Sequence, residues 1–173
     1  MAMKTIGEII VRGYTLTSEE FLVEFPDPVF VGVGVLSAGL MENTDRWRNT
    51  PILDLEYYSS GSGNEHDAMK IGTIIPVRST KNPNWTRLTI GRKPENDIAV
   101  DDPAVSEIHA YIKRHDGALI IGDFDSTNGT RVNGAPLVPP AIHSLRDEDI
   151  VTLGQCSFQF FTPTGLRQFL GLP

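Results

Sequence analysis

From about Met69 onward, short apolar runs alternate with turn residues roughly every ten positions, and no stretch between them has helical periodicity. Within two of these runs, Ile108–Arg114 and Cys156–Phe161, apolar and polar side chains alternate, as expected for strands with one buried face. Closely spaced strands without intervening helices favour an antiparallel β-sandwich over βαβ units. The predicted strands are Ile71–Val77, Arg87–Ile90, Ile98–Val100, Ile108–Arg114, Ala118–Phe124, Thr130–Val132, Asp149–Leu153 and Cys156–Phe161.

The N-terminal third of the chain has a different pattern. In Ile6–Gly13 the isoleucines recur at helical spacing, and a glycine stands where a helix would end. Thr17–Glu20 resembles a capping box at the start of a second helix, which Pro26 would end. Val29–Val35 reads as a short buried strand, and Ile52–Tyr58 as an edge strand.

The two parts also differ in charge, and a stretch of small polar residues joins them. Residues 1–67 contain four Lys/Arg and eleven Asp/Glu, whereas residues 68–173 contain eleven of each, so the net charge of −7 falls in the first part. Ser59–Asn64 reads as a linker or mobile loop. We therefore predict a small, acidic α/β extension at 1–67 with two short helices, a strand and the linker, a β-sandwich at 68–164, and a short helix or tail at 165–173.

Composition excludes several classes of protein. No apolar run approaches the roughly 20 residues of a membrane span, and the N-terminus lacks the pattern of a secretory signal. A single cysteine, Cys156, rules out an internal disulfide, and its apolar surroundings predict a packed core thiol. The negative net charge argues against general affinity for nucleic acid or anionic membranes. We expect a cytoplasmic protein without a nucleic-acid or membrane partner.

Four short motifs lie between the strand-like runs, in the order Ile90–Arg92, Ser106–His109, Ser126–Thr130 and Val132–Gly134. Together they place an arginine, hydroxyls and an amide on separate turns, which are the groups that bind a phosphate and the peptide carrying it. Alone, each fragment is common, because Asn-Gly pairs are ordinary turn residues and a lone serine is usually a cap or turn residue. Only the ordered set indicates phosphopeptide binding.

This ordered set resembles the forkhead-associated (FHA) domains, which are phosphothreonine-binding β-sandwiches, over residues roughly 69–162. The resemblance implies about eleven strands with the ligand on the loops at one end. It implies a non-catalytic adaptor in Ser/Thr kinase signalling, whose partner is a phosphothreonine-containing protein such as a kinase or its substrate. The matching segments are Leu88–Arg92, Asn96–Val100, Val105–Ala110, Asp125–Gly134 and Leu145–Gly154.

The resemblance also implies roles for single residues. Arg92 and Ser106 match the residues that contact the phosphate, Thr127 matches one that hydrogen-bonds the phosphothreonine, and Asn128 matches the asparagine that holds the peptide main chain. The matching residues that shape the loops without touching the ligand are His109, which braces them, and the turn glycines Gly91 and Gly129.

Two positions depart from the family pattern. Glu107 follows the serine, where the family often has a basic or amide residue. Its carboxylate could repel the phosphate, pair with Arg92 or turn away, so an FHA-fold interaction subunit with weak or no phosphate dependence is the alternative function. The second departure is Asp147–Asp149, in which a glutamate replaces the usual glycine of the turn.

An enzyme is the third possibility, and the sequence disfavours it. Ser106 and His109 could start a triad, but residues three apart on an emerging strand point to different faces. The histidines are scattered, with no metal-ligand spacing and no phosphate-binding glycine loop, so we expect no catalytic residue, metal or cofactor. A separate hypothesis is autoinhibition, in which phosphorylated Thr44 or Thr50 folds back onto Arg92 and Ser106.

Overall fold

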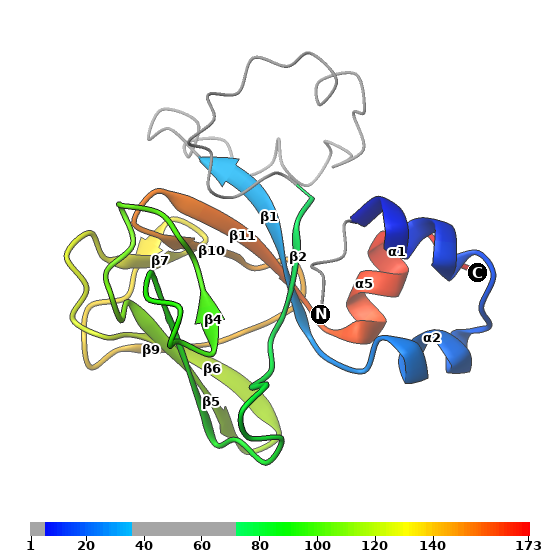
Figure 1. Ribbon diagram of the computed structural model, residues 1–173, viewed down its shortest axis with the longest axis horizontal. Helices are drawn as coiled ribbons and strands as arrows, with labels where there is room; N and C mark the ends of the chain where they lie inside the picture. The colour runs from blue at the N-terminus through cyan, green and yellow to red at the C-terminus, as the bar shows by residue number, and fades with distance from the viewer. Residues whose placement is uncertain (1–5, 36–71) are drawn as a thin grey trace.

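The computed structural model describes residues 6–35 and 72–173, which contain eleven strands and three helices (Figure 1). Among these residues, no helix is both long and apolar enough to cross a membrane. Several sequence predictions lie outside the described residues: the strand Ile52–Tyr58, the linker Ser59–Asn64, and the proposed phosphorylation sites Thr44 and Thr50.

Two sheets pack face to face, which confirms the predicted β-sandwich. The six-stranded sheet has the order β2-β1-β11-β10-β7-β8, and the five-stranded sheet has the order β4-β3-β5-β6-β9. Their facing sides bury side chains such as Leu88, Ile112, Val151 and Phe158 in one core. The strands are β1 (Val29–Val35), β2 (Ile74–Pro76), β3 (Arg87–Gly91), β4 (Ile98–Ala99), β5 (Ala110–His115), β6 (Ala118–Asp123), β7 (Thr130–Val132), β8 (Ala135–Pro136), β9 (Ile142–Ser144), β10 (Ile150–Leu153) and β11 (Cys156–Phe161).

Two details of the sandwich differ from the sequence prediction. Strand β4 runs parallel to β3, with Ile90 opposite Ile98, so the five-stranded sheet is mixed and not purely antiparallel. The apolar pattern also fails to predict β8 and β9. Strand β8 has only two residues, and no residue of β9 is buried, so neither leaves a periodic apolar signal.

Strand β1, which the sequence analysis places in the N-terminal extension, is an internal strand of the sandwich. It lies between β2 and β11, with Val31 opposite Ile74 on one side and Gln159 on the other. Its side chains alternate, so that Phe30 faces the core between the sheets while Val29 and Val31 face outward. Local pattern could not reveal this position, because the partner strand β11 lies at the other end of the chain.

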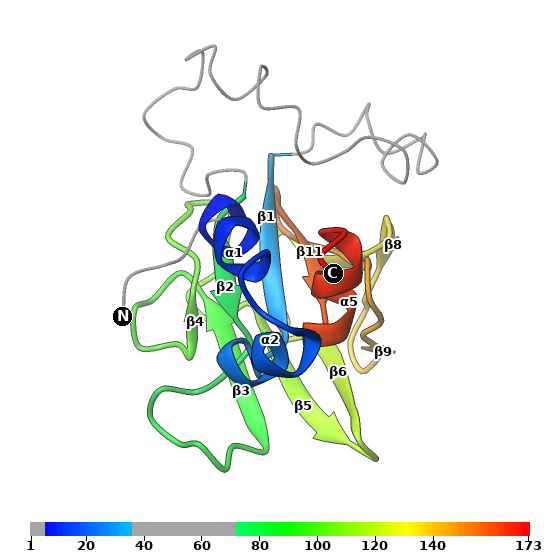
Figure 2. The ribbon, with the colours of Figure 1, turned by 90° about the vertical axis from the view of Figure 1, so that its right-hand side faces the viewer.

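Three short helices cover the outer face of β1 and β11 (Figure 2). They bury Ile9, Phe21 and Leu166 against Val31 and Phe161, which belong to those two strands. We call these helices and the apolar side chains beneath them the helix cluster. Its helices are α1 (Ile6–Gly13), α2 (Ser18–Glu24) and α5 (Pro163–Phe169).

Side-chain caps fix where two of these helices begin. The predicted capping box is confirmed, since Thr17 Oγ1 accepts from Glu20 N–H at 3.3 Å and Thr17 N–H donates to Glu20 Oε2 at 2.8 Å. Helix α5 is capped by Thr162, whose hydroxyl also donates to Asp147 Oδ2 at 3.0 Å. That bond ties the helix to the turn before β10, where Glu148 adopts the left-handed φ of 71° that favours glycine.

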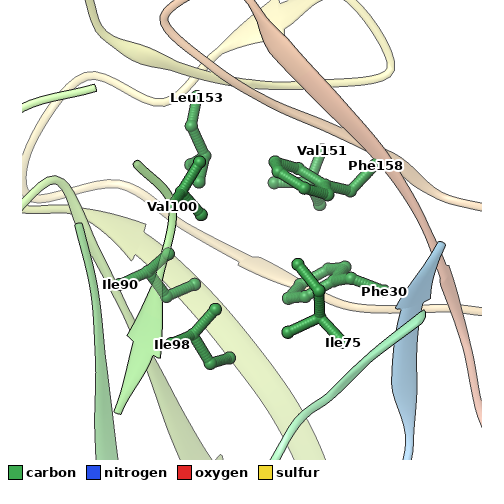
Figure 3. A pocket seen from close by; sticks show the side chains of 8 residues that line it. All are labelled: Phe30, Ile75, Ile90, Ile98, Val100, Val151, Leu153 and Phe158. Carbon is green, nitrogen blue, oxygen red and sulfur yellow. The ribbon is translucent and has the colours of Figure 1, made fainter. Parts of the chain in front are cut away.

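A small apolar cavity of about 10 Å³ remains between the sheets (Figure 3). Its lining includes Phe30 and Phe158 from the six-stranded sheet and Ile90 and Ile98 from the five-stranded sheet. A water molecule there would find no hydrogen-bond partner, so the cavity is dry. It is a minor packing defect of the core and not a ligand site.

We expect Leu166→Ala to lower the free energy of unfolding by about 2–5 kcal/mol, because this side chain is buried in the helix cluster. Since Val31 and Phe161 join the cluster to the sandwich, both should unfold in one transition. Urea denaturation followed by circular dichroism and by tryptophan fluorescence checks this, with the exposed Val11→Ala as control. Two separate transitions would contradict the coupling.

Candidate functional site

The backbone after β3 closes onto the loop between β4 and β5. Arg92 N–H donates to Ser106 O at 2.9 Å, and a Cβ on Gly91 would lie 2.3 Å from Glu107 O, so only glycine permits this approach. Arg92 Nε donates to Val105 O at 3.3 Å, which holds the guanidinium along the loop. Among the described residues neither Nη has a hydrogen-bond partner, so the exposed end of the side chain can bind a ligand.

The loop between β6 and β7 meets the same β4–β5 loop. Thr127 N–H donates to Ser106 Oγ at 3.0 Å, and the two hydroxyl oxygens lie 3.4 Å apart. Asn128 Nδ2 donates to Ala104 O at 2.8 Å across the same pair of loops. The structure therefore brings the four residues of the sequence prediction, including Arg92, onto adjoining loops at one end of the sandwich. Their binding roles stay predictions.

His109 lies beneath these loops and connects them. Its side chain is fully buried, Nδ1 accepts from Ser106 N–H at 3.0 Å, and Nε2 lies 3.1 Å from Gly129 O. Because Nδ1 is an acceptor, the ring is neutral and carries its hydrogen on Nε2, which donates to the carbonyl. Burial lowers the pKa of His109 and favours this neutral form. The geometry matches the bracing role that the sequence analysis gives to His109.

Two further residues hold the loops, and the sequence analysis missed both. Asn96 Nδ2 donates to the carbonyls of Lys93 and Glu107 at 2.8 and 2.7 Å. Asp123 accepts from Ser126 and from the Thr130 hydroxyl, each at 2.6 Å through Oδ2. Burial raises the pKa of Asp123, but these hydrogen bonds outweigh that effect and hold the pKa below its ordinary value.

Short-range signals for these two residues are visible in the sequence. Asp123 stands three residues before Ser126, and its Oδ1 accepts from Ser126 N–H at 2.9 Å, which is the spacing of a side-chain cap. Asn96 stands three residues after Lys93, whose carbonyl it contacts. In both cases the residue fixes a turn through the backbone, so it belongs to the frame of the site.

Glu107 pairs with Lys93 and not with Arg92. Its Oε2 lies 2.7 Å from Lys93 Nζ, and both side chains are more than half exposed. The hydrogen bond from Lys93 lowers the pKa of the Glu107 carboxyl, and the same bond raises the pKa of Lys93. The sequence analysis considered repulsion of a phosphate, a pair with Arg92, or a carboxylate turned away. It did not consider Lys93 as the partner.

Ser106 and His109 do not form a nucleophile–base pair. The imidazole Nδ1 bonds to the backbone N–H of Ser106, whereas Ser106 Oγ bonds to Thr127. A catalytic serine needs the base on its hydroxyl oxygen. Within the described residues there is no group of three or more His, Cys, Asp or Glu side chains that could hold a metal ion. Cys156 is buried, and burial raises its pKa to about 12.

Known proteins resemble the part of the chain that contains these loops. The sequence model of the FHA domain matches residues 88–154. The chain is similar to the oxoglutarate dehydrogenase inhibitor of Corynebacterium diphtheriae, with 50% identity over 48 residues, or 28% of this chain and 34% of that protein. It is also similar to human mediator of DNA damage checkpoint protein 1, with 30% identity over 114 residues, or 64% of this chain and 5% of that protein.

Among solved structures, the chain is similar to the FHA domain of an Arabidopsis thaliana hypothetical protein, with 28% identity, a TM-score of 0.47 and coverage of 53% of this chain and 75% of that one. It is also similar to Mycobacterium tuberculosis EmbR in complex with a low-affinity phosphopeptide, with 27% identity, a TM-score of 0.45 and coverage of 53% and 22%. The chain spans about a third of the length of the Corynebacterium protein.

We expect stability to fall as the pH drops below the ordinary histidine pKa of 6.5, because the unfolded chain then takes up a proton that folded His109 resists. Above that pH the contribution of the neutral ring is fully present. Unfolding free energies measured between pH 8 and pH 5, for the protein and for His109→Asn, check this. The variant should lose less stability over the acid range, whereas the exposed His115→Asn control should follow the parent protein. Parallel curves for all three would contradict the assignment.

Proposed function

Because residues 88–154 of this chain form an FHA domain, we propose that the loops after β3, β4 and β6 bind a phosphothreonine-containing peptide. The observation that carries the proposal is the contact of three loops around Ser106. Its carbonyl accepts from Arg92 N–H, and its Oγ accepts from Thr127 N–H. A cation and neutral donors thus lie on adjoining loops at one end of the sandwich, as binding of a phosphate dianion requires.

Arg92, Ser106 and Asn128 each have a hydrogen-bonding group that remains available to a ligand. Arg92 holds the loop through Nε, so both Nη groups can donate to phosphate oxygens. Ser106 Oγ already accepts from Thr127 N–H, and its own hydrogen reaches only a distant Thr127 Oγ1, so the phosphate can take that hydrogen bond. Asn128 uses its amide nitrogen on Ala104 O, which leaves its oxygen to accept from a peptide N–H.

On this basis we assign the protein a cytoplasmic, non-catalytic adaptor role in Ser/Thr kinase signalling, with a phosphorylated kinase or kinase substrate as partner. The preference for phosphothreonine rests on membership of the FHA family. The second candidate is an interaction subunit with the same fold and no phosphate dependence, and the carboxylate of Glu107 beside Ser106 favours it.

The primary test compares one peptide in its phosphothreonine and unmodified threonine forms by isothermal titration calorimetry. The phosphorylated form should bind more tightly, and Arg92→Ala should weaken its binding on the order of tenfold to a hundredfold, because charge-assisted hydrogen bonds are lost. The exposed Arg146→Ala, on the turn before β10, is the matched control. Equal binding of both peptides by all three proteins would favour the phosphate-independent candidate.

The Glu107–Lys93 pair should lower the affinity for a phosphopeptide without preventing binding. An exposed ion pair is weak and exchanges partners readily, so Lys93 can leave Glu107 for a phosphate bound at the neighbouring Arg92. We therefore expect Glu107→Gln to free Lys93, tighten phosphopeptide binding and increase its salt dependence.

A double-mutant cycle tests this exchange by calorimetry. The gain from Glu107→Gln should vanish in a Lys93→Gln background, because no lysine remains to be released. A gain of equal size in both backgrounds would show that Glu107 repels the phosphate directly and that Lys93 is a bystander.

A further inference from the structure

The outward face of the five-stranded sheet carries an aromatic surface that the proposed binding site does not use. Tyr111 on β5 lies across the neighbouring strand β6, where a Cβ on Gly122 would come within 2.4 Å of the Tyr111 hydroxyl oxygen. Phe124 stands edge-on to Tyr111, with ring centroids 6.4 Å apart, and is 43% exposed. The glycine lets the tyrosine ring lie flat, so the sheet presents an aromatic surface.

Two cations lie over these rings. The Arg87 guanidinium carbon is 4.7 Å from the Tyr111 centroid and 4.9 Å from the Phe124 centroid, and Lys113 Nζ is 4.9 Å from Tyr111. Arg87 and Lys113 are opposite each other in the β3–β5 register, and both are exposed. We call Arg87, Tyr111, Lys113 and Phe124 the cationic platform. Neither cation takes part in an ion pair among the residues that the structure describes.

The platform is uncompensated in a chain of net charge −7. Asp97, which contacts β3 at Thr89, already accepts from Ser79 Oγ at 2.6 Å and from Thr89 N–H at 3.0 Å. A surface of two rings and two exposed cations that form no ion pair among the described residues complements an anionic, partly apolar partner. None of the residues that alternation places on the outward face of β3, β5 and β6 is acidic: they are Arg87, Thr89, Gly91, Tyr111, Lys113, His115, Ala118, Ile120 and Gly122.

The platform adjoins the candidate site. Phe124 directly precedes the loop that carries Thr127 and Asn128, and its N–H donates to the carbonyl of His109 at 2.9 Å. A peptide held by that loop can therefore continue onto the sheet face. We propose that the cationic platform binds an acidic segment of the same ligand, next to its phosphothreonine. This inference rests on the proposed function and adds a preference for ligand sequence.

The test measures binding of the full chain to a set of peptides by calorimetry at low and at physiological salt. The set contains a phosphothreonine core, the core with a short Asp/Glu segment that includes one isoleucine on its N-terminal side, and the core with that segment on its C-terminal side. Matched Asn/Gln extensions on each side and the acidic segment without phosphate complete it. We expect the acidic extension on one side to tighten binding about threefold to tenfold, more at low salt, and the Asn/Gln extension to add nothing.

The variant Arg87→Gln/Lys113→Gln should remove the gain from the acidic extension and leave binding of the core unchanged. Arg167→Gln, on helix α5 of the helix cluster, is the control for a general loss of positive charge. Since Arg87 and Lys113 are exposed, circular dichroism of the variants should match that of the parent protein.

The outcomes separate the two proposals. A core peptide that binds without any gain from the acidic extension overturns the platform and leaves the proposed function standing. If no phosphopeptide binds but the acidic segment alone binds through Arg87 and Lys113, the proposed function fails and the platform survives as an anion-binding surface. Tighter binding of a single-stranded oligonucleotide of equal charge at the same two residues would overturn the choice of an acidic peptide.

Discussion

One buried imidazole holds together two of the loops at the candidate site. His109 accepts a hydrogen bond from the backbone of one loop and donates to the backbone of another, and it satisfies both only while it is neutral. Half-buried Ser106 and exposed Thr127 touch each other because this connection fixes the distance between their loops. Their preorganisation is therefore a property of the buried frame, which lowers the cost of ordering the site when a ligand arrives.

The buried contacts that hold the loops and the contacts at the surface differ in what it costs to break them. The buried contacts of Asn96, His109 and Asp123 are polar groups with fixed backbone partners, and losing one partner would leave a desolvated group unsatisfied. Contacts at the surface, such as the Lys93–Glu107 pair, are exposed and replaceable. A binding site needs both properties, because the geometry has to persist while the outer hydrogen bonds exchange with a ligand.

Sequence reasoning predicted most of the sandwich, since alternation marks strands. Its ordered turn motifs also identified four residues that the structure brings onto adjoining loops, and their binding roles stay predictions. It missed what depends on distant or unpatterned partners. The internal position of β1 is set by pairing with β11 at the far end of the chain. The partner of Glu107 is set by how two loops approach at Gly91, which no local pattern encodes. Strand β9 has no buried residue, so hydrophobic periodicity could not identify it.

The position of β1 has a consequence for how the molecule forms during synthesis. One of its edges pairs with β11, and its outward valines pack against residues of β11 and α5, which are synthesised long after β1. Until they emerge, β1 has an unpaired edge, and Val31 lacks its neighbours Phe161 and Leu166. Such long-range closure is slow, and exposed strand edges favour aggregation. The nascent chain therefore has to keep this one edge of β1 unpaired until β11 has been made.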